Sequence, residues 1–165
     1  MELEEFNRLD ARSAAELLRP CLDIDRWVDA VVAGRPYRDL AAAVEAARTA
    51  AWPWTTAEID RALARHPRIG EHAGGADAEA ALSRAEQARV GTASADVAAA
   101  LAAGNRAYEA TFSRVFLVRA AGRSAEEILE ALQERLTHSE AEEIPVIAEQ
   151  LRQIAALRME GILTA

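Results

Sequence analysis

Four copies of a helix-start pattern, in which serine or threonine is followed three residues later by glutamate, are spread along the chain. They are Ser13-x-x-Glu16, Thr55-x-x-Glu58, Ser124-x-x-Glu127 and Ser139-x-x-Glu142. In this pattern the hydroxyl and the glutamate carboxylate each accept a backbone N–H that the first helical turn leaves unpaired. Alanine is abundant and aromatic residues make up only 5% of the 165 residues, which favours helices over sheets. The sequence therefore predicts an all-α fold.

Apolar periodicity and these helix starts together predict eight helices. We expect them at Ser13–Leu18, Ile24–Ala33, Tyr37–Ala51, Thr55–Arg65, Asp77–Ala88, Ser94–Phe112, Ser124–Leu136 and Pro145–Ile162. No internal repeat and no long linker divides the chain. We therefore expect residues 1–165 to form a single-domain helical bundle, since this length can bury a core of its own.

Charge and cysteine content restrict the class of protein. The formal net charge of -8 argues against binding of nucleic acid or an anionic membrane across the whole surface. Cys21 is the only cysteine, so no internal disulfide can form, and we expect a small buried side chain there. The longest apolar run, Val97–Ala103, is too short to cross a bilayer, and the acidic start of the chain is unlike a signal peptide. We expect a cytoplasmic protein.

Two stretches do not fit a plain bundle. In residues 66–75, HPRIGEHAGG, Pro67 stops the preceding helix and three glycines keep the chain irregular. Irregular loops held by rigid helices often carry function. Residues 111–120, TFSRVFLVRA, are either a helix end or an extended segment. An extended segment without a partner strand would have backbone N–H groups that need acceptors.

An arginine falls on the apolar stripe of the last expected helix. Ile147, Leu151, Ile154 and Arg158 follow one another in steps of four, three and four residues, so they share one face. Arg158 therefore snorkels out, forms a structural salt bridge, or meets an anion inside the protein.

His66 continues a similar stripe, after Ile59 and Leu63, and lies at the C-terminus of its helix. The negative end of the helix dipole favours a protonated imidazole, which suits a proton donor. The alternative is a core histidine bonded to a carbonyl. A zinc site using His66, Glu71 and His72 is weakly indicated, because the spacing is not a common one and no cysteine lies near.

The segment Ser83-x-x-Glu86-Gln87 is open to two interpretations as well. It matches a capping box, and a helix start also presents N–H groups and a positive dipole end that suit a carbonyl or an anion.

Taken together, these segments resemble the 2-oxo-4-hydroxy-4-carboxy-5-ureidoimidazoline (OHCU) decarboxylase family over nearly the whole chain. The motifs that carry the resemblance are HPRIGE at residues 66–71, Ser83-x-x-Glu86-Gln87, Asn105-x-x-Tyr108-x-x-x-Phe112, VFLV at residues 115–118 with GRS at 122–124, and Ile154-x-x-Leu157-Arg158.

The resemblance implies an all-α homodimer that decarboxylates OHCU to (S)-allantoin and CO2, late in urate breakdown, without a metal or other cofactor. It implies that His66, Glu86 and Arg158 are catalytic, with His66 as the proton donor. It also implies a substrate-binding set made of Pro67, Ser83, Gln87, Phe116, Leu117, Val118, Arg119 and Ala120. The last five of these bind ligand largely through the backbone.

This chain departs from the family pattern at three positions. Leu82 stands where tryptophan is frequent, Ser113 where glycine is frequent, and Arg119 where a smaller side chain is frequent. None of them removes a group that the reaction needs. The residues alone also leave room for a non-catalytic helical protein that binds a purine-breakdown product, and for a lyase acting on another ureido or imidazoline acid.

Overall fold

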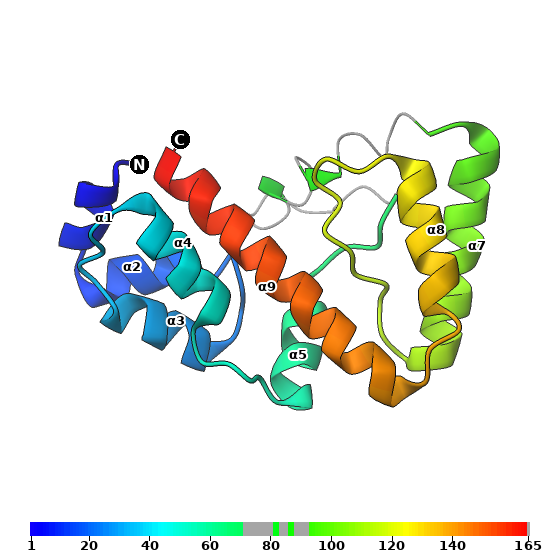
Figure 1. The fold of residues 1–165 in the computed structure, drawn as a ribbon, viewed down its shortest axis with the longest axis horizontal. Coiled ribbons are helices and arrows are strands. Elements are labelled where there is room, and N and C mark those ends of the chain that lie inside the picture. The colour runs from blue at the N-terminus through cyan, green and yellow to red at the C-terminus, as the bar shows by residue number, and fades with distance from the viewer. Residues whose placement is uncertain (71–80, 83–85, 88–92, 165) are drawn as a thin grey trace. The chain divides into compact units, whose positions relative to one another are not determined.

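The computed structural model describes residues 1–70, 81–82, 86–87 and 93–164, and these residues form α-helices and no strand (Figure 1). The predicted all-α fold is confirmed. The chain packs as two units, the first made of Met1–Ala62 with Leu151–Ala165 and the second of Leu63–Gln150. The expectation of a single domain stays a prediction. No helix in the described ranges is long and apolar enough to span a membrane.

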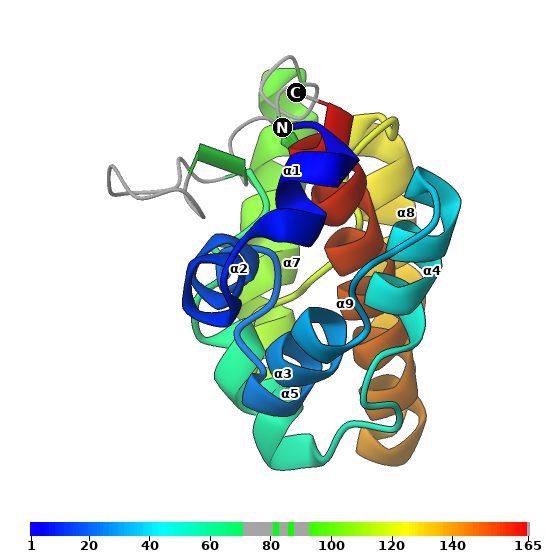
Figure 2. The same ribbon diagram turned by 90° about the vertical axis from the view of Figure 1, so that its left-hand side faces the viewer.

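The first unit holds the N-terminal helices and the end of the last one (Figure 2). These are α1 (Leu3–Arg8), α2 (Ala11–Leu18), α3 (Asp25–Ala33), α4 (Leu40–Thr49), α5 (Thr56–Leu63) up to Ala62, and α9 (Glu140–Thr164) from Leu151. Trp27 of α3 is fully buried, and its indole N–H donates to the carbonyl of Ala47 on α4 at 2.7 Å. Cys21 is buried, as expected. All three tryptophans, at positions 27, 52 and 54, belong to this unit.

The second unit is built on α7 (Ala95–Phe112) and α8 (Ala125–Arg135), together with the start of α9. Figure 1 shows α7 and α8 side by side and pointing the same way, with residues 113–124 leading the chain from the end of α7 back to the start of α8. Gly104 lets these helices approach closely, because a Cβ there would lie 2.4 Å from Leu132 Cδ2. Their shared core also takes in Ile69, Phe116 and Val118 from outside the helices.

Three of the four expected capping boxes are confirmed. Thr55, Ser124 and Ser139 each accept from the backbone N–H of the glutamate three residues on, and each of those glutamates accepts in return. The prediction of a capping box at Ser13 is wrong. Asp10 is the N-cap of α2, and its carboxylate accepts from the Ser13 backbone N–H at 3.0 Å. Aspartate caps as well as serine does, so the earlier residue begins the helix.

Other boundaries also differ from the expectation. α1 was not expected, and α4 begins after Asp39, whose carboxylate accepts from Ala42 N–H at 2.7 Å. α9 begins at Glu140 rather than at Pro145, because the Ser139 cap starts the helix and Pro145 then lies inside it. The helix expected at Asp77–Ala88 falls mostly outside the described residues.

The stretch 111–120 divides at Ser113. α7 ends at Phe112, and Ser113 adopts the left-handed conformation with φ 54° while its N–H donates to the Glu109 carbonyl. Residues 115–120 that follow are neither helix nor strand. Glycine is the residue that takes a left-handed helix C-cap without steric cost. Ser113 therefore occupies a position that glycine would adopt at a lower steric cost.

Ser113→Gly is expected to raise the free energy of unfolding by about 0.5–1 kcal/mol. The left-handed conformation costs an L-residue roughly 1–2 kcal/mol, and the greater chain entropy of glycine offsets part of the gain. Thermal denaturation measures the change. Ser124→Gly is the matched control, because it removes a capping hydroxyl at φ -81° and should lower stability slightly. A lower melting temperature for Ser113→Gly would show that the left-handed turn is not strained.

Candidate active site

His66 follows the last turn of α5 and is buried, with 8% of its surface exposed. Its backbone N–H donates to the Leu63 carbonyl at 2.9 Å, which continues the helical turn by one bond. Pro67, which cannot extend a helix, begins the loop. Burial of His66 agrees with its place on the apolar stripe. The imidazole is therefore held in the protein interior and not on an exposed loop.

The loop after His66 is fixed at three consecutive residues. The Arg68 guanidinium forms a two-point ion pair with the carboxylate of Glu109 on α7, and this cation lowers the pKa of the Glu109 carboxyl. The Ile69 carbonyl accepts from Asn105 Nδ2 at 2.9 Å. The next N–H, of Gly70, donates to Gln87 Oε1 at 3.0 Å. Two amide side chains thus hold opposite edges of the peptide group between Ile69 and Gly70.

The side-chain oxygen of Asn105 takes no part in holding the loop, unlike its Nδ2. The residue is 3% exposed, and its Oδ1 is buried without a hydrogen-bond partner among the described residues. An unmatched buried acceptor is costly, so this oxygen favours an N–H or O–H donor beside it.

The segment 116–120 shares the core of the same unit. Phe116, Leu117, Val118 and Ala120 are buried, between 2% and 6% exposed. The backbone N–H groups of Leu117 and Val118 donate no hydrogen bond to any of the described residues. The N–H of Arg119 differs, because it donates to Gln150 Oε1 at 2.9 Å. Two adjacent donors therefore remain on this segment.

A buried charged cluster, made of Arg135, Glu143, Tyr108 and His138, contacts this segment at the Leu117 carbonyl. Arg135 of α8 is 5% exposed and Glu143 of α9 is 1% exposed, and they are joined by Arg135 Nε to Glu143 Oε1 at 2.7 Å. The Tyr108 hydroxyl donates to the same carboxylate, and burial together with this bond raises the pKa of Tyr108. His138 Nδ1 lies 2.8 Å from Glu143 Oε2. Arg135 also donates to the Leu117 carbonyl at 2.5 Å.

Arg135 is not among the site residues expected from the sequence, although its helix carries a periodic signal. Ile128, Leu132 and Arg135 follow the same stepwise spacing as the residues before Arg158, and all three are buried. The loop contacts of Glu109 and Gln150 had no such signal.

Arg158 lies in the first unit, on the α9 stripe that the sequence predicted. It is 2% exposed, in line with Leu151 and Ile154 at 0% and 3%. Its Nη1 donates to the Pro20 carbonyl at 2.8 Å. The same Nη1 lies 3.5 Å from the Cys21 carbonyl oxygen. Burial rules out the snorkelling alternative.

The remaining sequence candidates are only partly described. Glu86 and Gln87 are half-buried in the second unit, and Pro67 is also half-buried. Ser83 lies outside the described residues, as do Glu71 and His72 of the weak zinc alternative. Among the residues that are described, no group of three potential metal ligands was found.

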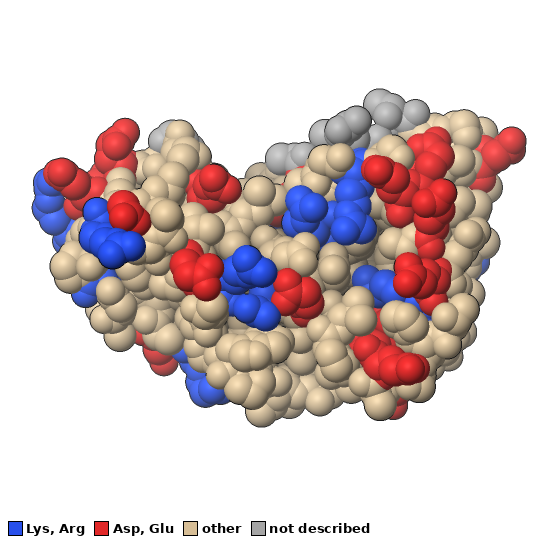
Figure 3. All heavy atoms as spheres, in the orientation of Figure 1, with Lys and Arg blue, Asp and Glu red and all other residues tan. Residues whose placement is uncertain are grey.

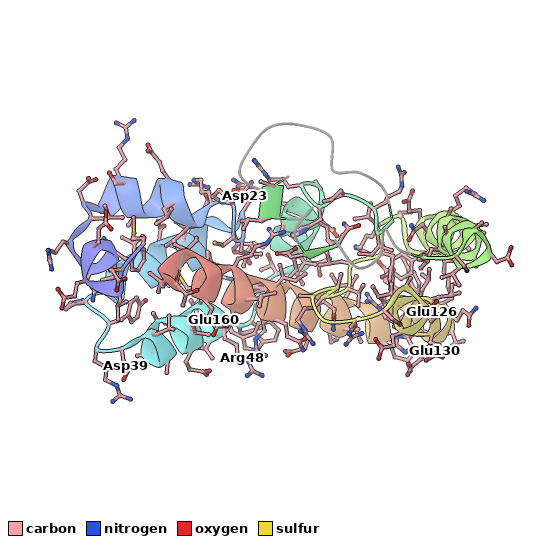
Figure 4. The ribbon with its side chains drawn as sticks, turned by 90° about the horizontal axis from the view of Figure 1, so that it is seen from above. Asp23, Asp39, Arg48, Glu126, Glu130 and Glu160 are labelled. Carbon is pink, nitrogen blue, oxygen red and sulfur yellow. The ribbon has the colours of Figure 1, made fainter. Side chains whose placement is uncertain are left out.

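The exposed face of α8 is acidic. Figure 3 shows acidic side chains gathered along this helix, and Glu126 and Glu130, one turn apart, are labelled in Figure 4. Glu127 and Glu134 on the same helix are exposed as well. A row of carboxylates repels a polyanion, so this face does not suit nucleic acid.

Comparison with known proteins gives a consistent result. A protein-family model described as OHCU decarboxylase matches residues 7–160. A crystal structure of OHCU decarboxylase in the presence of (S)-allantoin has a TM-score of 0.72 at 23% identity, covering 89% of this chain and 96% of that chain. A crystal structure of (S)-allantoin synthase has a TM-score of 0.71 at 15% identity, covering 96% of this chain but only 53% of that one. No curated protein sequence matches the chain. The two crystal structures share its fold.

Proposed function

Because the chain belongs to the OHCU decarboxylase family, we propose that it decarboxylates OHCU to (S)-allantoin and CO2, the last step in converting urate to allantoin. The observation that carries the proposal is the family match over residues 7–160. The fixed loop after the buried His66 supports it, since a proton donor must be held in place to act on one face of a ring.

The reaction requires the protein to stabilise a developing negative charge and to deliver a proton to one face of the ring. The carbon–carbon bond to the carboxylate breaks, CO2 leaves, and the electron pair spreads into the adjacent carbonyl and C=N system of the ring. Fixed hydrogen-bond donors aimed at this charge stabilise the transition state. A proton then adds to the ring, and delivery to one face yields a single enantiomer.

We assign the catalytic roles to three side chains. His66 delivers the proton, Glu86 accepts from the ureido or ring N–H groups, and Arg158 pairs with the anionic part of the ligand. The backbone N–H groups of Leu117 and Val118 add two donors, and their lack of an acceptor among the described residues supports this role.

The other residues orient the substrate. Gln87 does so through Nε2, because its Oε1 already accepts from Gly70. Ser83 adds a hydroxyl. The substrate also contacts Pro67, Phe116, Arg119 and Ala120.

Chiral analysis of the allantoin formed from urate tests the proposal, with urate oxidase and hydroxyisourate hydrolase present and this protein added or omitted. We expect (S)-allantoin with the protein and racemic product without it, because OHCU also decays unaided. Racemic allantoin in both samples, with allantoin still bound in calorimetry, would favour a non-catalytic binding protein.

Decarboxylation is expected to need no metal or organic cofactor, since the developing charge can be met by side-chain and backbone donors. Dialysis against EDTA should leave kcat and KM unchanged. Activity that is lost on chelation and restored by zinc would contradict this.

The family resemblance also supports a homodimer, and light scattering of the purified protein measures the mass directly. A monomer mass across the working concentration range would refute the dimer without touching the proposed reaction.

A further inference from the structure

Arg135 occupies an unusual position for a buried cation. Its guanidinium carbon lies 4.7 Å from the centre of the Phe116 ring and 5.6 Å from that of Tyr108. Nε and Nη2 face the Glu143 carboxylate, and Nη1 donates to the Leu117 carbonyl at 2.5 Å. The guanidinium thus contacts two aromatic rings and one carboxylate. Its hydrogen bond to the segment 116–120 goes to a single backbone carbonyl, that of Leu117.

That carbonyl belongs to the peptide group between Leu117 and Val118. The peptide is trans, since the cis bonds of the described chain are at Pro36 and Pro53. In a trans peptide the C=O and the N–H are coplanar and point in opposite directions. By holding the Leu117 oxygen, Arg135 therefore fixes the Val118 N–H on the far side of the peptide plane.

The bond also changes the strength of the donor. A hydrogen bond from a cation is stronger than one between neutral groups, and hydrogen bonds in series polarise one another. A positive charge at the Leu117 oxygen draws electrons from the amide and makes the Val118 N–H a better donor. This N–H has no acceptor among the described residues.

We infer that Arg135 is a positioning residue, which orients and polarises the Leu117–Val118 peptide so that the Val118 N–H can stabilise the negative charge that develops on the substrate. Glu143 serves to hold Arg135 in this orientation. The inference rests on the proposed function. A stability role explains the cluster less well, because a buried ion pair is often no more stable than apolar residues of the same volume.

The test compares a charge-neutral double variant with a core variant. Arg135→Met combined with Glu143→Gln removes both charges and keeps the volume similar, so no buried charge is left unpaired. Leu101→Ala, a core residue of the same unit, is the matched control for lost stability. For each protein we would measure melting temperature, kcat, KM and the amide proton shift of Val118 in ¹⁵N-labelled, ligand-free samples.

We expect the double variant to lose about tenfold or more in kcat with a smaller change in KM, somewhat less than direct removal of a charge-stabilising donor costs. The Val118 amide proton should move upfield, because its peptide loses a cationic partner. Leu101→Ala should lower the melting temperature while keeping kcat and the Val118 shift. If the double variant does not fold, Arg135→Lys, which keeps the charge but not the planar fork, is measured in its place.

An unchanged Val118 shift, or a kcat equal to that of Leu101→Ala, overturns the inference. A different result contradicts the proposed function, namely a wild-type protein that does not decarboxylate OHCU. The Val118 shift needs no substrate, so it still decides in that case whether Arg135 polarises the peptide.

Discussion

His66→Asn is expected to fold, to bind allantoin, and to decarboxylate OHCU about a hundredfold or more slowly than the wild type, the usual scale for loss of a general acid. Asparagine keeps a hydrogen-bonding side chain of modest size but cannot donate a proton near neutral pH. The loop should keep its shape, because Arg68, Ile69 and Gly70 are each held by other residues. Single-turnover kinetics and calorimetry with allantoin separate chemistry from binding.

The handedness of the product gives a second, independent readout. Without His66, solvent supplies the proton to either face of the ring, so the allantoin formed by His66→Asn should approach a racemic mixture. Arg65→Gln, at an exposed neighbouring position, is the control and should keep both rate and handedness. Enantiopure allantoin at near wild-type rate would exclude His66 as the donor. Enantiopure product at a low rate would assign it a positioning role instead.

Arg158→Gln is expected to lower kcat/KM by about 10²–10³, the range for removing one donor to a developing anion, while the protein stays folded. Glutamine keeps a polar amide but is shorter than arginine, so it loses the charge for the ligand together with the bond that Arg158 Nη1 makes to the Pro20 carbonyl at 2.8 Å. Kinetics and melting curves on the same samples measure the two effects.

Arg152→Gln is the matched control for Arg158→Gln. Arg152 lies on the same helix and also donates to a backbone carbonyl, that of Arg48 at 2.9 Å, and its guanidinium stacks on the Trp52 ring. We expect Arg152→Gln to keep kcat/KM. If Arg158 only closes a structural salt bridge, Arg158→Gln would instead lose several kcal/mol of stability, as when one buried charge is left alone, at unchanged kcat/KM.

Local sequence rules predicted much of the helical architecture. The caps at Thr55, Ser124 and Ser139 depend on residues three apart, so the pattern can be read directly from the chain. The burial of His66 and Arg158 followed from helical periodicity for the same reason. Where two capping residues compete, as Asp10 and Ser13 do, the pattern alone did not decide which of them begins the helix.

The geometry of the candidate site was less accessible from sequence. Asn105 and Gln87 hold the peptide after Ile69 across 36 and 17 residues of chain, and no local pattern pairs an amide side chain with a distant peptide. The family motif marked both residues as members without giving their task. Arg135 had the periodic signal, but its contact with the Leu117 carbonyl depends on how residues 113–124 return past α8.

The placement of the tryptophans determines what fluorescence can report about this chain. Trp27, Trp52 and Trp54 all belong to the first unit, so tryptophan emission follows the unfolding of that unit alone. Circular dichroism at 222 nm follows helices of both units. A chain that unfolds as one cooperative domain gives the same urea midpoint by both probes, whereas independent units give two. The aromatic residues thus provide a built-in way to ask whether the two units fold together.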